Sequence, residues 1–327
     1  MSNDEVSPRP VPRWVQRWAV ATVALTAVPV AYGGWVTTRG VGMSDPVWPT
    51  TPWYLLFADW TEPRPGFIIE HTHRLAGYMI GAMVLVLTWG LWKRSRSPAL
   101  RWLGVATLAA VLVQGMLGGI RVVWHELAGT ELAIVHGCFA QLFFALLTGT
   151  SVLCFPVRAE GNASEADLRR MRRLSVALAA VVFVQIVWGA VLRHAPNPAV
   201  QRLHLLMAFA VVGFAVLVIR VAGAPQFGRR YARARIALMA LLTLQLLLGV
   251  EAWMGKFPAG VLPELVKLTA GQVQIRILHV LVGAGVFATS VSFALMACLP
   301  AGVRVEPLAT EPLGRPSAAA QPVGGTA

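Results

Sequence analysis

The sequence predicts an all-α membrane protein whose eight transmembrane helices form two pseudo-symmetric four-helix bundles. Of the 327 residues, 56% are hydrophobic and only 13% are charged, whereas soluble domains carry about 25% charged residues. The hydrophobic residues occur in long blocks, and motifs in the first half of the chain recur in the second half. The low charge excludes a pair of soluble domains, because too few charged side chains remain to cover their surfaces.

Each hydrophobic block is long enough to cross a bilayer, which takes about 20 mostly apolar residues. Length and flanking charges identify the spans, because periodicity does not distinguish a spanning helix from a buried one. The second block contains Glu70, His71, His73 and Arg74, and the seventh contains Glu251, so neither is apolar throughout. In chain order, the expected spans are residues 16–38, 67–93, 101–121, 132–156, 173–193, 202–222, 235–255 and 276–299.

Lysine and arginine alternate between richer and poorer loops, and this alternation predicts the topology. The richer segments contain Arg9, Arg13 and Arg17, then Lys93, Arg94 and Arg96, then Arg169, Arg170, Arg172 and Arg173, and finally Arg229, Arg230, Arg233 and Arg235. By the positive-inside rule, both termini lie in the cytoplasm and the protein lies in the inner (plasma) membrane, in contact with lipid. The net charge of +13 therefore reflects topology, and nucleic acid is excluded as a partner.

The segments outside the spans have their own expected roles. Residues 1–15 are expected to be a cytoplasmic tail before a first span that is retained, because the N-terminus contains Asp4 and Glu5 and has no small-residue cleavage site. Residues 158–172 form a cytoplasmic linker, and residues 300–327, rich in proline, alanine and glycine, are predicted to be disordered. The three cysteines lie in or beside apolar blocks and indicate no disulfide framework.

The two halves of the chain, residues 16–157 and 173–299, resemble each other. Gln114 and Gly118 recur as Gln245 and Gly249, and the same offset relates His73 to His204. Because each repeat has four spans, its orientation is preserved, and the halves should be related by an axis along the membrane normal. We therefore expect one bundle from each half.

Four histidines follow this repeat, and they are the first candidate functional residues. His73, His136, His204 and His279 lie near the starts of the second, fourth, sixth and eighth spans. These spans run in the same direction, so the imidazoles should lie at one depth near the outer face. Two facing imidazoles in a helix bundle suit axial ligation of haem iron, whereas zinc requires more ligands for each site. The alternative is a polar residue that is tolerated at a helix end.

The halves differ at the position one helical turn before the first histidine. Glu70 precedes His73, whereas the amide Gln201 precedes His204. Residues three apart share a helix face, so the Glu70 carboxylate can reach a group held at His73. This difference predicts a reactive site with an acid/base group in the first half, and a storage or electron-transfer site in the second. Alternatively, Glu70 forms an ion pair with Arg74 or Arg121.

Two arginines near the outer ends of the second and third spans are candidate cofactor-binding residues. Arg74 and Arg121 are suited to pair with haem propionates, although they also fit as snorkelling anchors of the spans. The first outer loop, 39–69, contains several tryptophans and fits either a cap over the first site or an interfacial aromatic belt. His71, His125 and His194 receive no assignment.

These motifs resemble those of the haem A synthase family of bacterial and mitochondrial membrane enzymes. The matching stretches extend over both halves in chain order: Ile69–Arg74 (IEHTHR), Gln114–Arg121 (QGMLGGIR), Ile134–Gln141 (IVHGCFAQ), Leu244–Met254 (LQLLLGVEAWM) and His279–Gly283 (HVLVG). The resemblance implies a two-step oxidation of a methyl group of haem O to the formyl group of haem A, for terminal oxidase biogenesis. A haem O synthase and oxidase-assembly factors are then the implied partners.

The resemblance also implies roles for the candidate residues. His73 and His136 would flank the substrate haem with Glu70 serving the reaction, and His204 and His279 would ligate haem b. One feature differs from many bacterial members, which carry a cysteine pair in the first outer loop. The corresponding stretch here, Gly40–Pro49, contains no cysteine.

Two other functions remain open on the sequence. The first is a di-haem b membrane electron carrier, although transmembrane electron transfer favours haems near opposite faces. The second is a transporter built from a parallel duplication, with histidines in a proton path. That function predicts interrupted helices at matching positions, but Pro29 in the first span has no counterpart in the fifth.

Overall fold

The computed structural model describes residues 11–45, 64–155, 162–256 and 268–298, and they are helical almost throughout. Eight of the helices in these ranges are long and apolar enough to cross a membrane, and the described residues contain no strand. They are α1 (Arg13–Arg39), α2 (Pro65–Arg94), α3 (Pro98–Val123), α4 (His125–Leu153), α5 (Glu165–His194), α6 (Pro198–Ala222), α7 (Ala232–Lys256) and α8 (Ala270–Cys298), with a short 3₁₀ turn, η2 (Pro225–Phe227), before α7. The predicted all-α fold class with eight spans is therefore confirmed, and the chain is a multi-pass membrane protein.

Several predicted elements fall outside the described residues. These are residues 1–10 of the N-terminal tail, most of the first outer loop with its tryptophans, and the tail at 300–327. The predicted division into two bundles, with its domain boundaries and symmetry axis, stays a prediction.

Most helices extend beyond the predicted hydrophobic spans, whereas α4 ends at Leu153, before the predicted residue 156. Capping residues set several of these ends. α5 begins at Glu165, within the stretch predicted as a linker, where the side chains of Ser164 and Asp167 form a reciprocal capping box. Asn197 caps α6 through a 3.0 Å hydrogen bond from the Val200 N–H. At the end of α1, Gly40 has a φ of +66°, a left-handed conformation that suits glycine and stops the helix.

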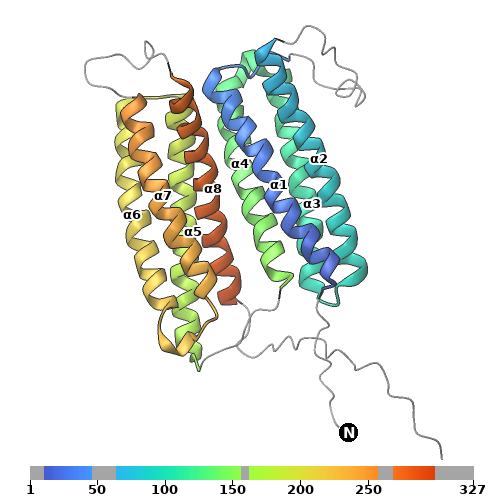
Figure 1. Ribbon diagram of the computed structural model, residues 1–327, viewed down its shortest axis with the longest axis vertical. Coiled ribbons are helices and arrows are strands. Elements are labelled where there is room, and N and C mark those ends of the chain that lie inside the picture. The colour runs from blue at the N-terminus through green and yellow to red at the C-terminus, as the bar shows by residue number, and fades with distance from the viewer. Residues whose placement is uncertain (1–10, 46–63, 156–161, 257–267, 299–327) are drawn as a thin grey trace, which may run out of the picture.

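Figure 1 shows α1–α4 beside α5–α8, with all eight axes nearly parallel. α4 and α8 meet where the two sets touch, and α1 also contacts α8. Arg193 joins α5 to α1. Its guanidinium donates to the Gly34 oxygen at 2.5 Å and to Thr38 Oγ1 at 2.8 Å, both on α1. Gly34 itself lies against Ile277 of α8. The two sets are therefore joined close to the ends at which α1 and α5 finish.

Apolar packing is concentrated at one end of the helices. The cluster among α1–α4 includes Val15, Leu87 and Leu147, and a second cluster, formed by α4–α8, includes Met171 and Phe293. These residues lie toward the starts of α1 and α5 and the ends of α2, α4 and α8. Burial of their side chains supplies the main stabilising packing between helices. The opposite end, here called the outer end after the predicted topology, contains the buried charged residues Asp45, Glu70 and Arg74.

Candidate functional site

The structure brings the four repeated histidines together as two pairs. His73 on α2 faces His136 on α4, with ring centres 6.4 Å apart and ring planes inclined at 78°. His204 on α6 faces His279 on α8 at the same 6.4 Å separation, with planes inclined at 71°. One pair thus belongs to α1–α4 and the other to α5–α8, as the repeat predicts.

The separation of the rings suits one metal ion between each pair. An imidazole nitrogen binds a transition metal at about 2 Å, so two rings on opposite sides of one ion have centres roughly 6 Å apart. In the second pair, Nδ1 of His204 and Nδ1 of His279 are buried without a hydrogen-bond partner. The described residues contain no group of three or more histidines, cysteines or acidic residues placed to hold a metal, so the donor set fits haem iron better than zinc.

A glycine on the preceding helix lies against each imidazole. A Cβ added to Gly33 would lie 3.1 Å from Cε1 of His73, and one added to Gly118 would lie 3.3 Å from Cε1 of His136. The second half repeats the contact. A Cβ added to Gly189 would lie 3.0 Å from Cε1 of His204, and one added to Gly249 would lie 3.1 Å from Cε1 of His279. These four glycines make room for the rings, while several other helical glycines, such as Gly77 and Gly213, face open space.

A hydrogen-bonding group lies four residues before each of these glycines. The Pro29 oxygen lies 2.9 Å from Nδ1 of His73, and the Gln114 amide lies 3.2 Å from the His136 ring nitrogens. In the second half, the amides of Gln185 and Gln245 lie 3.4 and 3.2 Å from Nε2 of His204 and His279. The sequence interpretation assigned no role to Gln185 or Gly33. The recurring Gln-x-x-x-Gly spacing is the signal that could have identified Gln185.

Glu70 lies in a buried ionic network close to the first histidine pair. Glu70 is 4% exposed, Arg74 8%, and Asp45 and His71 are fully buried. One oxygen of Glu70 pairs with Arg74 at 2.9 Å, and the other accepts a 2.9 Å hydrogen bond from the Asp45 N–H. Asp45 in turn contacts Nδ1 of His71 at 2.9 Å and Arg74 at 3.1 Å, and Phe67 stacks on the His71 ring.

The ion pair between Glu70 and Arg74 is the arrangement that the sequence left open as an alternative to an acid/base role. Arg74 also donates to the Asp45 oxygen, so its guanidinium is committed inside the network. Asp45 and the role of His71 were missed, because no local pattern in the loop before α2 relates Asp45 to residues on that helix.

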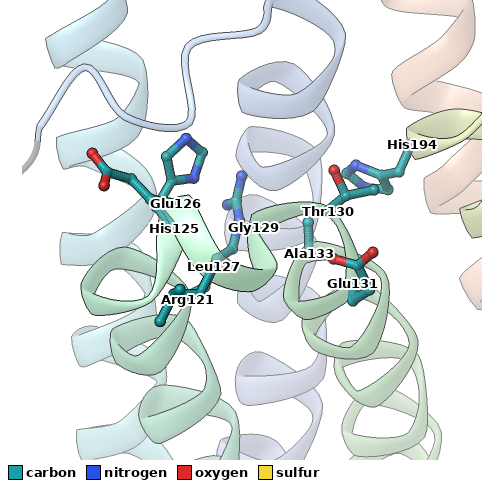
Figure 2. Close-up of a pocket in the computed structure, with 9 residues that line it drawn as sticks. All are labelled: Arg121, His125, Glu126, Leu127, Gly129, Thr130, Glu131, Ala133 and His194. Atoms are coloured by element: carbon teal, nitrogen blue, oxygen red, sulfur yellow. The ribbon is translucent and has the colours of Figure 1, made fainter.

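Arg121, the other predicted propionate partner, has a different environment. Its Nε is buried without a hydrogen-bond partner, and it lines a pocket of about 400 Å³ at the outer ends of α3 and α4. Figure 2 shows His125 and Glu126 on one side of this pocket and Glu131 and His194 on the other. The pocket opens where α4 departs from helical geometry, at Ala128 with φ −149°. Arg121 thus remains available to an anionic group.

The second histidine pair has two arginines nearby that the sequence interpretation did not select. Arg193 is within electrostatic range of both Arg276 and His279. Arg276 lies one turn before His279 on α8, and its guanidinium donates to the Gly255 oxygen at 3.3 Å. Neither arginine has an ion pair with a carboxylate among the described residues, so both suit an anionic ligand at this end of the helices.

Replacement of Gly249 by alanine is expected to displace His279, because the new methyl group would lie 3.1 Å from the ring. Gly213→Ala is the matched control in the same half, since its Cβ would meet nothing within 4 Å. Alanine is favoured over glycine in a helix by about 1 kcal/mol, so the control should melt at the same or a higher temperature. Thermal unfolding and haem content of both variants check this, and equal behaviour would contradict the close contact.

The chain is similar to one protein family and to individual proteins of known description. A family model described as cytochrome oxidase assembly protein matches residues 2–148 and, in an overlapping match, residues 58–196, which together are more than half of the chain. A protein described as heme A synthase from Geobacillus kaustophilus (strain HTA426) is 25% identical over 183 residues, which are 54% of this chain and 56% of that protein. The heme A synthase of Lysinibacillus sphaericus (strain C3-41) is 22% identical over 183 residues, 54% of this chain and 58% of that protein. The aligned region thus spans little more than half the length of these relatives.

Proposed function

The chain belongs to the cytochrome oxidase assembly protein family, and on that premise we propose that it is a haem A synthase-like oxidoreductase. It converts a methyl group of haem O to the formyl group of haem A by successive oxidations, in support of terminal oxidase biogenesis. The observation that carries the proposal is the pair of similar bis-histidine sites, of which one has a buried carboxylate, Glu70, one helical turn before its first histidine. Gln201 occupies the corresponding place in the other half.

The first histidine pair is the substrate site in this proposal. His73 and His136 would hold the substrate haem from opposite sides, with the His73 ring oriented by the Pro29 oxygen. Oxidation of the methyl group requires an oxygen donor and an electron acceptor from outside the chain, and Glu70 would take up a proton that the oxidation releases. Arg74 and the Asp45 N–H hold the two carboxylate oxygens in fixed directions. Arg121, with its buried unpaired Nε, would receive a propionate of the substrate.

The second pair is the electron-transfer site. His204 and His279 would hold a haem b, and the 6.4 Å separation of their rings is consistent with that ligand. Haem b, when bound, would supply a one-electron redox centre. Gln201 stands in this half where Glu70 stands in the first, and Arg193 and Arg276 would balance the charge of the propionates.

The same proposal implies partners and a membrane location for the protein. Haem O would come from a haem O synthase, and the product would pass to oxidase-assembly partners. The loop charges favour the inner (plasma) membrane with both termini in the cytoplasm. Both histidine pairs then lie near the outer face.

A di-haem b membrane electron carrier is the second candidate function. It is favoured by the equal 6.4 Å separation in the two pairs and by the ion pair that engages Glu70. The position of both pairs at the same end of the helices argues against it, because transmembrane transfer requires haems at different depths.

Haem extraction and a pyridine haemochrome spectrum of the detergent-purified protein, expressed with a supply of haem O, distinguish the two functions. We expect b-type haem together with haem O, its hydroxylated intermediate or haem A. B-type haem as the sole pigment would favour the electron carrier. A protein without haem would contradict both functions and the ligand role of the four histidines.

A further inference from the structure

The side-chain amides of Gln114, Gln185 and Gln245 occupy equivalent places beside three of the four paired histidines. Each lies on the helix before its histidine, one turn from the glycine that faces the ring. Each amide lies 3.2 to 3.4 Å from an imidazole nitrogen. At the fourth histidine, His73, the Pro29 oxygen takes this place. The arrangement therefore recurs in both halves, and the backbone of Gln185 and of Gln245 also lies within hydrogen-bonding range of His204 and His279.

Unpaired polar atoms are concentrated at these contacts. Oε1 of all three glutamines is buried without a hydrogen-bond partner, as is Nδ1 of His204 and of His279. A buried polar atom left unpaired costs about 1–3 kcal/mol, so such atoms are retained where a ligand or a function uses them. Apolar side chains at these positions would pack the helices without leaving buried polar atoms unpaired.

The chemistry of an amide beside an imidazole explains these atoms. A glutamine can turn either its NH₂ group or its oxygen toward the ring. When the oxygen accepts the imidazole N–H, the tautomer is fixed and the other ring nitrogen keeps the lone pair that a metal requires. Metal-ligating histidines generally have such a partner, which also makes the ligand more basic.

We propose that Gln114, Gln185 and Gln245 are positioning residues that orient the iron-ligating imidazoles of His136, His204 and His279. Their unpaired oxygens accept the imidazole N–H when the other ring nitrogen binds iron. The proposal rests on the proposed function, because it requires haem between the histidines.

Gln245 is the best position for a test, because its amide is close to His279 in the half where haem b would be resident. Gln245→Leu removes the acceptor with little change in size, and Gln245→Glu replaces it with a stronger one. Loss of a second partner to a metal-ligating histidine typically costs 10–100-fold in metal affinity. We therefore expect haem b to dissociate about 10–100-fold faster from Gln245→Leu. The midpoint potential should rise in Gln245→Leu and fall in Gln245→Glu, because a more basic ligand favours the ferric state.

Gln16→Leu is the matched control. Gln16 is partly buried and donates a 2.9 Å hydrogen bond to the Cys154 oxygen at the opposite end of the helices. Its replacement should leave both the potential and the dissociation rate of haem b unchanged. A residue that acts by packing alone would shift the potential in the same direction in both Gln245 variants.

Each outcome decides between the hypotheses. Opposite shifts of the potential support the positioning role, whereas shifts in one direction, or none, overturn it. If Gln245→Leu does not fold, the sign of the shift in Gln245→Glu and the dissociation rate of haem b from Gln185→Leu give the answer. A wild-type protein that holds no haem b contradicts the proposed function itself, whereas normal haem b with unaffected variants contradicts the role of the glutamines alone.

Discussion

His204→Ala is expected to remove the b-type haem from the purified protein while haem O and its oxidised products remain bound to the first half. The reason is that His204 and His279 form a pair separate from His73 and His136, and each pair has its own glycine contacts. If His204 and His279 together hold haem b, as proposed, the substitution leaves a single imidazole to hold it. Pyridine haemochrome and reduced-minus-oxidised spectra of the variant measure this loss.

His125→Ala is the matched control for this substitution. His125 is an exposed histidine at the same outer end, on α4, and belongs to neither pair. Its replacement should leave the complete haem complement. If His204→Ala kept its b-type signal, or if His125→Ala lost it to the same extent, the second pair would not be the haem b site.

Glu70→Gln is expected to stop haem A production while both haems still bind. Glutamine preserves the size of the side chain and an oxygen that can accept from the Asp45 N–H, but it cannot take up a proton. Removal of a general acid/base group typically lowers the rate by 10²–10⁴-fold. Haem A in membranes of cells with a haem O supply gives the measurement, and the haem content of the purified variant shows whether binding is preserved.

Asp45→Asn separates a proton-transfer role of Glu70 from a purely structural one. It disturbs the same buried network, because Asp45 contacts His71 and Arg74, but it leaves the Glu70 carboxylate in place. We expect a smaller loss of haem A than in Glu70→Gln. Equal losses in the two variants would indicate that the ion pair with Arg74 is structural, and full haem A production by Glu70→Gln would exclude an acid/base role.

The helical organisation was predictable because its signals are local in the sequence. Block length and flanking charge identify a span without knowledge of its neighbours, and all eight predicted spans correspond to helices. The helix ends were less predictable. α5 starts at Glu165 because of a polar capping box, and a search for apolar blocks does not detect polar turns that continue a helix beyond the membrane.

The histidine pairs were also predictable, because a duplicated frame places His73, His136, His204 and His279 at matching positions. Once the spans run in a known direction, equal positions along them mean equal depths. Sequence spacing does not, however, say which neighbour each ring contacts. Gly33 is an example, because nothing in the sequence shows that it contacts His73 on α2.

The sequence by itself thus determined the eight helices, and it predicts one depth for the four histidines. Only the tertiary structure decided that Asp45 joins Glu70, His71 and Arg74, and that Arg193 joins α5 to α1. It also showed which amide and which glycine lie against each imidazole. The physical reason is that hydrophobic length and charge act within one segment, whereas these contacts depend on how packed helices rotate about their axes and bring distant residues within hydrogen-bond distance.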